Sequence, residues 1–296
     1  MSRTARLLFL LLLSLGAATL LATGGLMTFP AGQAQSLSLK PVAATAPDIP
    51  LNDEESRTEQ ELLALANRSR RQAGVPPLSL NGGLSRAARA HALTMFEARR
   101  LSHQFDGEPS LPKRLAAATN LLLDQEGENL ALDYDAEHGH QHLMLSPPHR
   151  ANLLNPAYNV VGLGVVRNGD RLYIVQDFGH ALPDYSADEV RNRVALAVER
   201  KRSQANRSQL SRHHLPTADA AACSMAQADR LATSPVRNLA QRYTVLTYTS
   251  LHPETLPNQA SRAISNRGLK NFSVGTCYAR TQTYPSGVYW IVVSLE

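Results

Sequence analysis

The chain has 296 residues, of which 43% are hydrophobic and 19% charged, values typical of a globular protein with one or two domains. Its formal net charge is +5 at pH 7, and two of those charges, Arg3 and Arg6, lie close to the N-terminus. The remaining excess of positive charge is too small to indicate a nucleic-acid-binding protein.

An export signal is predicted over residues 1–34. Two arginines precede an apolar run from Leu7 to about Met27, and GQA, ending at Ala34, has the small residues that a signal peptidase reads. The alternative is an uncleaved membrane anchor, because a span needs about 20 apolar residues. In both cases the rest of the chain is expected to be secreted, periplasmic or otherwise extracytoplasmic. Residues 35–55, rich in Pro, Ala and Ser, are predicted to be a linker.

Two amphipathic helices are predicted next. The first begins near Thr58, which precedes Glu61 by the spacing of a capping box, and it ends at Gly74. The second covers about 84–95, where apolar residues recur on one stripe. His91 lies on that stripe, so we expect a hydrogen-bonded core histidine there rather than a site residue.

The pattern then changes to loops and strands. Loops are predicted up to residue 126, followed by a third helix over 136–145 with Asp135 as its N-cap. VVGLGVVRNGDRLYIVQDF reads as two strands, with Asn168-Gly169 supplying the positive φ of a tight hairpin. Helices followed by a pair of antiparallel strands indicate an α+β domain over residues 56–183.

The last hundred residues resemble a degenerate second copy. After a linker predicted at 184–194, ALAVERKRSQANR parallels LLALANRSRRQAG, and a strand–turn–strand pattern with a shared Val-Gly ends residues 195–296. This alignment places Cys277 at the position of Gly164 and Cys223 on the second helix of the copy. The copy lacks the GEN and Ser-Pro-Pro-His sequences. An unrelated α+β domain is the alternative.

Cys223 and Cys277 are the two cysteines of the chain, and an exported compartment permits a disulfide between them. The bridge would close a loop of about 54 residues and stabilise the fold by roughly 4 kcal/mol on the loop-entropy model. The alternative is two unpaired thiols.

A basic stretch runs from Arg191 to Arg212, with seven basic residues against one acid, Glu199. A solvated helix face and linker is the ordinary interpretation. The alternative is a patch that contacts an anionic surface, a phospholipid or an acidic wall polymer, with a strong dependence on salt. The candidate residues for this contact are Arg191, Arg193, Arg200, Lys201 and Arg202.

Three residues could carry chemistry in the first domain: His103 in LSHQF, Glu128 in GENLA and His149 in SPPHRANLL. Histidine and glutamate can ligate a divalent metal or act as an acid–base pair. Their spacing alone is weak evidence. His138 and His142, four residues apart on the third predicted helix, have a spacing that suits a metal, but a solvated polar helix face is the preferred explanation.

The elements occur in the order of a known family. Asn67 with Arg70 and Arg71, the Leu84-to-Met95 stripe, His103, GENLA, SPPHR-ANLLNP, VGLGVV and the closing YIVQDF together resemble the CAP superfamily, also called SCP or PR-1-like proteins, in its bacterial form. The resemblance covers about residues 58–180. It implies an α-β-α sandwich whose cleft is lined by two histidines and often two glutamates, which bind a divalent cation in some members.

The resemblance assigns positions to the candidate residues. It implies that GENLA brings Glu128 into the cleft and that the SPPHR turn, stiffened by its prolines, presents His149. Ser146 stands where the fuller family pattern has a second glutamate, and the usual tryptophan before this turn is replaced by Leu143. A zinc site of His103, His149 and Glu128 with a water ligand remains chemically acceptable, and His142 is a substitute ligand.

Three functions follow. We expect an exported protein that binds a lipid, glycan or cell-envelope component through the His/Glu cleft, with a divalent metal as an optional ligand of that cleft. The first alternative is a metal-dependent hydrolase of cell-wall or peptide bonds, in which Glu128 acts as the base. The second is a purely structural envelope protein. No nucleophile motif, P-loop or dinucleotide fingerprint is found in the sequence.

Overall fold

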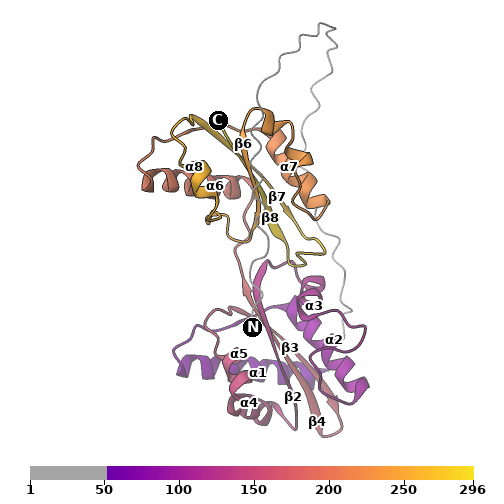
Figure 1. The fold of residues 1–296 in the computed structure, drawn as a ribbon. Helices are drawn as coiled ribbons and strands as arrows, with labels where there is room; N and C mark the ends of the chain where they lie inside the picture. The colour runs from indigo at the N-terminus through magenta and orange to yellow at the C-terminus, as the bar shows by residue number, and fades with distance from the viewer. Residues whose placement is uncertain (1–51) are drawn as a thin grey trace. The chain divides into compact units, whose positions relative to one another are not determined.

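A computed structural model describes residues 52–296; the predicted signal and nearly all of the linker predicted at 35–55 lie outside this part of the chain. The described chain divides into two compact units, each with helices around a four-stranded sheet (Figure 1). None of the helices in 52–296 is both long and apolar enough to span a bilayer. The N-terminal unit comprises residues 52–184 and Gln282–Gly287, and the C-terminal unit comprises Tyr185–Thr281 and Val288–Glu296.

The sheet of the N-terminal unit has the strand order β1-β3-β4-β2. The short β1 pairs with β3 in parallel, and the other neighbours are antiparallel. Strand β2, which contains GENLA, therefore lies at an edge of this sheet. The strands are β1 (Ser79–Leu80), β2 (Leu123–Asp133), β3 (Val160–Asn168) and β4 (Arg171–Ala181).

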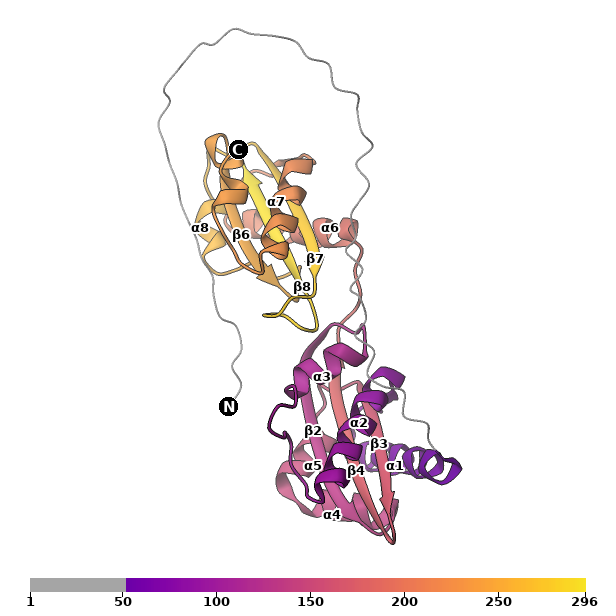
Figure 2. The ribbon, with the colours of Figure 1, turned by 90° about the vertical axis from the view of Figure 1, so that its right-hand side faces the viewer.

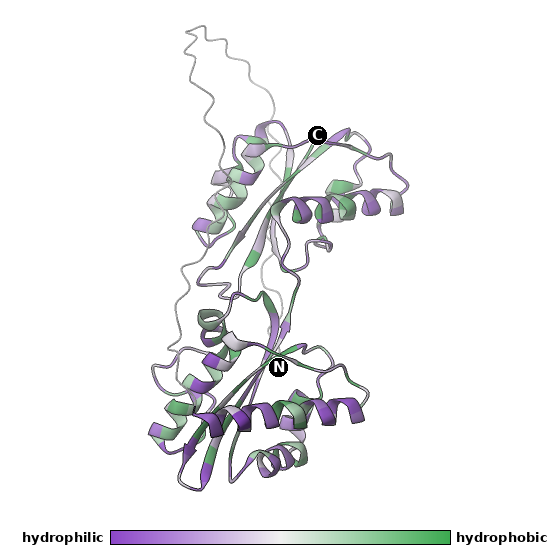
Figure 3. Ribbon diagram, turned by 180° about the vertical axis from the view of Figure 1, so that it is seen from behind, coloured by the Kyte–Doolittle hydropathy of each residue, from purple (hydrophilic) through white to green (hydrophobic). Residues whose placement is uncertain are grey.

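Helices cover both faces of this sheet. One face packs against α2 (Gly82–Ala98) and α3 (Leu111–Ala118), and the other against α1 (Asp53–Gln72), α4 (Ala136–Leu145) and α5 (Pro147–Leu153) (Figures 1 and 2). Hydrophobic and hydrophilic residues alternate along α1, as expected for a helix with one buried face (Figure 3). The result is an α-β-α sandwich, so the predicted fold class is confirmed.

Helix α2 lies directly on β3 because the strand carries glycines beneath it. A Cβ atom added to Gly164 would lie 2.2 Å from the carbonyl carbon of Ala88, and one added to Gly162 would lie 2.1 Å from that of Leu84. This close approach fixes the position of α2 and of the loop that follows it, which contains His103.

The first helix begins earlier than the sequence predicted. The capping box is formed by Asn52 and Glu55, whose amide nitrogen lies 2.8 Å from the Asn52 Oδ1, and acidic residues fill the first turn. Thr58 instead lies inside the helix and donates its hydroxyl to the Glu54 carbonyl oxygen. The prediction of Thr58 as the cap, and of a linker reaching residue 55, was wrong.

Residues 99–126 are more ordered than predicted. They include helix α3, and β2 begins at Leu123, where loops were expected. Helix α4 matches its prediction at both ends, with Asp135 accepting from the His138 amide. In the β3–β4 hairpin Gly169 has a positive φ of 61°, whereas Asn168 pairs with Arg171 and does not.

A fully buried arginine ties the N-terminal unit together. The guanidinium of Arg70 on α1 donates to the carbonyl oxygens of Pro76, Leu153, Asn155 and Tyr158 at 2.7–3.0 Å. These acceptors lie on the loop before β1, at the end of α5 and on the segment between α5 and β3. Hydrogen bonds satisfy the buried charge, as burial requires.

The C-terminal unit repeats this strand order as β5-β7-β8-β6, again with a parallel first pair. Arg202 is buried in it and donates to the carbonyl oxygens of Ser208, Ile264 and Asn266. The elements are α6 (Ala187–Gln204), β5 (Ser211–Arg212), α7 (Pro216–Gln227), the 3-10 turns Ser234–Val236 and Leu239–Gln241, β6 (Thr244–Ser250), α8 (Ala260–Ile264), β7 (Asn271–Ala279) and β8 (Val288–Leu295).

Two sequence predictions about this unit need correction. The linker predicted at 184–194 is mostly helix, because α6 begins at Ala187 after a capping box of Ser186 and Glu189. The alignment of the two halves was also wrong by two residues. Strand β1 pairs with Val160 as β5 pairs with Asn271, which places Cys277 level with Val166 rather than Gly164.

The disulfide prediction is confirmed. Cys223 on α7 and Cys277 on β7 are bridged, with their Cα atoms 5.0 Å apart. The bond joins the helix to the sheet that it covers, and it closes 54 residues of chain.

Candidate functional site

Glu128 lies on the edge strand β2, on the face that packs against α2. Leu130, two residues further along, belongs to the hydrophobic cluster with Ala88 and Ala92 of α2, and side chains two apart on a strand share a face. Glu128 is only 6% exposed. A carboxylate so deeply buried requires charged or hydrogen-bonding partners.

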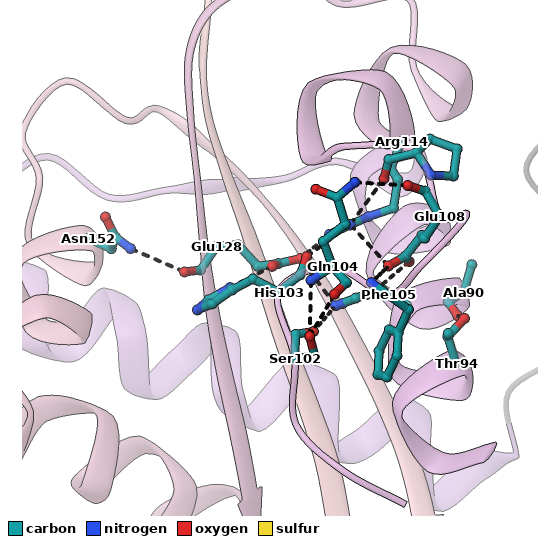
Figure 4. A network of polar contacts seen from close by, with 12 residues as sticks. Ala90, Thr94, Ser102, His103, Gln104, Phe105, Glu108, Arg114, Glu128 and Asn152 are labelled. Carbon is teal, nitrogen blue, oxygen red and sulfur yellow. Dashed lines mark hydrogen bonds and ion pairs between the residues drawn. The ribbon is translucent and has the colours of Figure 1, made fainter. Parts of the chain in front are cut away.

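His103 is the first partner of Glu128. Its Nδ1 lies 2.8 Å from Glu128 Oε1, and its side chain is 62% exposed (Figure 4). The contact through Nδ1 leaves Nε2 on the exposed side of the ring. The structure therefore brings together two of the three predicted site residues, with the carboxylate orienting the imidazole.

Arg114 is the second partner, and sequence reasoning missed it. It extends from α3 to form an ion pair with Glu128 Oε2, and Nη1 also donates to the His103 carbonyl oxygen at 3.2 Å (Figure 4). Its side chain is 7% exposed. Breaking a buried ion pair by removing one partner typically costs about 3–5 kcal/mol, so loss of either side chain would strongly destabilise this site.

The network also includes His91, which lies on α2. Its Nδ1 lies 2.7 Å from Glu108 Oε1, and its Nε2 lies 2.9 Å from the Ser102 carbonyl oxygen and 3.8 Å from Glu128 Oε2. It is completely buried, so the prediction of a hydrogen-bonded core histidine is confirmed. The structure adds that this core histidine borders the site.

Asp177 on β4 lies directly across the strand pair from Glu128. The Glu128 carbonyl oxygen accepts from Asn152 and so points away from β4, which makes the pair a non-hydrogen-bonded one with closely spaced side chains. Asp177 is completely buried. Burial, and then the negative charge of Glu128, hold the pKa of Asp177 well above its usual value, which favours its protonated form.

His149 lies in the first turn of α5, after Pro147 and Pro148, which suit the start of a helix. Its carbonyl oxygen accepts from Asn129 Nδ2 at 3.0 Å, which ties it to the residue beside Glu128. Burial, and then the positive charge of His103, lower the pKa of His149.

Three predicted residues do not join this network within the described chain. Ser146 caps α5 only through its backbone, and its side chain makes no capping bond. His142 contacts Asp133 Oδ2 at 2.6 Å, five residues along β2 from Glu128, or about 17 Å at the rise of a strand. The prediction of His142 as a substitute ligand was therefore wrong. His138 likewise contacts Asp135.

The donor set does not fit the predicted zinc ion. In residues 52–296 no group of three or more His, Cys, Asp or Glu side chains is arranged to hold a metal. Both Glu128 oxygens already have partners, one of them the Arg114 cation, and His103 uses Nδ1 on Glu128. Two imidazoles at most remain as ligands, one fewer than the usual set of protein ligands at a catalytic zinc.

Sequence analysis did not identify Arg114, Asp177, Asn129 or Asn152 as residues of the site. Arg114 lies on the short helix expected to be loop, and nothing in its neighbourhood indicated its partner. Asp177 did carry a signal, because a carboxyl within the apolar strand sequence YIVQDF must be buried. Asn129 and Asn152 join β2 to α5 through Asn152 Nδ2 and Asn129 Oδ1 at 3.0 Å.

The α-β-α sandwich and its His/Glu network define the class of the N-terminal unit, and comparison with known proteins agrees. Residues 63–178 match the family model described as "CAP: Cysteine-rich secretory protein family". The N-terminal unit is a CAP domain, as its motifs predicted.

Relatives share only part of the chain. "Uncharacterized protein YkwD" of Bacillus subtilis (strain 168) is 30% identical over 115 residues, which are 38% of this chain and 44% of that protein. The chain thus matches less than half the length of this curated relative.

Solved structures show the same partial coverage. An extracellular protein containing an SCP domain from Bacillus anthracis is 25% identical over 45% of each chain, with a TM-score of 0.40. The structure titled "NaASP2 with Zn2+" is 14% identical, covering 46% of this chain and 85% of its own, with a TM-score of 0.32. With TM-scores this low, the family assignment rests on the match over residues 63–178.

Proposed function

We propose that this protein is an extracytoplasmic binding protein that takes a lipid, glycan or other envelope component at the edge of β2. The observation that carries the proposal is the His103–Glu128 pair. Glu128 holds the imidazole by Nδ1 while 62% of the His103 side chain remains exposed. An oriented imidazole beside a second one, His149, suits hydrogen bonding to hydroxyl, phosphate or carboxylate groups.

Exposed leucines favour an amphiphilic ligand. Leu101 is 42% exposed and precedes His103 by two residues, and Leu145 is 70% exposed and precedes His149 by four. Apolar side chains that flank polar groups are typical of sites for ligands with both kinds of surface.

The predicted export of the protein is consistent with this proposal. The predicted signal precedes the described residues, and a disulfide such as Cys223–Cys277 persists in oxidising compartments. The similar protein from Bacillus anthracis is described as extracellular.

We infer that the C-terminal unit is a degenerate copy of the CAP domain that lacks the site. Arg70 and Arg202 make matching backbone contacts, and the two sheets have matching strand orders. In this register Val245 and Ser294 stand where the first unit has Glu128 and Asp177. The unit would then support the first or provide a docking surface.

The proposed anionic contact of the C-terminal unit is smaller than the sequence predicted. Arg202 is buried, and Arg191 is paired with Asp188 and Asp219. The remaining candidates on α6 are Arg193, Arg200 and Lys201, and binding through them should weaken with salt.

Binding of the purified protein to phospholipid vesicles and to isolated cell wall tests the proposal. His103→Ala and His149→Ala are expected to weaken binding, whereas His142→Ala serves as the matched control. His142 is also 62% exposed and also held through Nδ1 by a buried carboxylate, but it lies outside the site. If all three variants bind as well as the wild type, the site has no role in binding. The same conclusion follows if all three, including the control, lose binding to the same extent.

The hydrolase alternative is less well supported, because Glu128 is paired with Arg114 and is poorly placed to activate water. It requires turnover of casein or cell wall that Glu128→Gln abolishes. A purely structural protein, the other alternative, would bind neither vesicles nor wall through His103.

A further inference from the structure

We propose that Arg114 determines the ligand specificity of the site. Its guanidinium occupies the position beside Glu128 that a divalent cation would otherwise take. The site would then select ligands that hydrogen-bond to His103 and His149, and it would not form a metal chelate with Glu128. This deepens the proposed function and rests on it for the identity of the ligand.

The geometry makes Arg114 a built-in cation rather than a surface arginine. It reaches Glu128 from α3 with its side chain 7% exposed, and Nη1 lies 3.2 Å from the His103 carbonyl oxygen and 3.4 Å from that of Pro109. Nη1 also lies 3.6 Å from Glu108 Oε2. These contacts come from several directions, so Arg114 cannot leave Glu128 without losing all of them.

The network already contains a fixed positive charge, the Arg114 guanidinium. Glu128 and Glu108 face Arg114 and His91, and the remaining carboxyl, Asp177, is buried next to Glu128. A divalent ion on Glu128 would be placed beside the guanidinium in a poorly solvated site, where like charges repel strongly. Loss of the guanidinium would free Glu128 Oε2 for another cation.

Zinc binding by isothermal titration tests this directly. Arg114→Met removes the charge while keeping an unbranched side chain, and it is expected to raise zinc affinity by about 10–100-fold, the range typical of changes to a metal-site partner. The gain should vanish in the double variant Arg114→Met/Glu128→Gln. Arg114→Lys, which keeps the charge, should bind zinc as weakly as the wild type. A folded Arg114→Met protein without the gain overturns the proposal.

A second measurement does not depend on the folding of any variant. In the wild-type protein titrated with Zn²⁺, the guanidinium ¹⁵N resonances of Arg114 are expected to stay in place, because Arg114 keeps its contact with Glu128 even where zinc binds the exposed ring of His103. A loss or large shift of the Arg114 signals as zinc saturates the histidines would show that the ion displaces the guanidinium, and it would refute the role of Arg114.

The two proposals fail separately. Loss of vesicle and wall binding in His103→Ala, together with unchanged zinc affinity in Arg114→Met, rejects the cation role of Arg114 and leaves the binding function standing. A zinc gain in Arg114→Met, together with equal vesicle and wall binding by His103→Ala and wild type, supports Arg114 and rejects the binding function.

Discussion

At the scale of single residues, the site depends on buried charges that satisfy one another. Glu128 faces Arg114, His91 and His103, and Asp177 lies across the strand pair from it. The exposed imidazole of His103 is oriented by this buried group. Because the supporting residues come from α2, α3, β2 and β4, a change at one of them alters a contact made by another element.

The buried Asp177 should lower stability as pH rises. Its pKa is raised in the folded protein, so the folded state binds more protons than the unfolded state between the two pKa values, and stability falls as pH rises through that window. Asparagine cannot ionise. Asp177→Asn is therefore expected to be more stable than wild type at pH 7, with a difference that shrinks toward pH 4 by up to about 1.4 kcal/mol per pH unit.

Urea unfolding of both proteins from pH 4 to pH 8 measures this difference. Titrating groups that do not interact with Asp177 are common to the two chains and cancel in the comparison. A stability difference that does not vary with pH would show that Asp177 has the same pKa in the folded and unfolded states.

Sequence reasoning captured the residues with strong local signals and missed their partners. His103, Glu128 and His149 lie in recognisable short motifs, and the structure places the first two in contact and the third beside them. Arg114 is 14 residues from Glu128 in sequence, and the contact depends on how α3 folds back over β2. Such a contact leaves no periodic or compositional trace.

At the scale of elements, apolar periodicity and capping residues predicted helices with a clear pattern and missed the shortest elements. Helix α4 has a clear cap at Asp135 and was predicted correctly, whereas α3 has only eight residues and offers too few turns for a pattern. Strand β2 was not predicted, because Glu128 and Asn129 are polar and yet buried. Functional residues obscured the alternation that would have identified their own strand.

Close packing of α2 on β3 gives an element-scale prediction. Gly164→Ala would place a methyl group 2.2 Å from the α2 backbone, and the helix would have to move, at a cost of about 1–3 kcal/mol or more. Gly82→Ala, in the first turn of the same helix, meets no atom within 4 Å and should be neutral or slightly stabilising. Urea midpoints compare the two variants.

The displaced helix should also disturb the site, because the loop after α2 carries His103. Gly164→Ala is expected to change the ring ¹⁵N chemical shifts of His103, while Gly82→Ala leaves them as in the wild type. Similar stability of the two alanine variants would show that α2 does not rest on β3 as closely as described.

At the scale of the whole molecule, each unit has its own sheet and its own buried arginine. The sequence indicated two units, but it placed the start of the second at 195, because the charged residues of α6 resembled a solvated linker. Arg202 belongs to that charged stretch and is nevertheless part of the core. A buried arginine satisfied by backbone carbonyls cannot be distinguished in sequence from a surface one.

The disulfide should stabilise the C-terminal unit alone. Replacing both Cys223 and Cys277 by serine opens the 54-residue loop and is expected to cost that unit about 4 kcal/mol. Trp290, the single tryptophan of the chain, is 1% exposed on β8 and pairs in register with Cys277. Its fluorescence therefore reports unfolding of the C-terminal unit, whereas far-UV circular dichroism reports both units. In the serine variant the fluorescence midpoint in urea should fall well below that of the wild type, and circular dichroism should retain a transition at the position set by the N-terminal unit. If both signals shift together by the same amount, the two units unfold as one, and the bond stabilises the entire described chain.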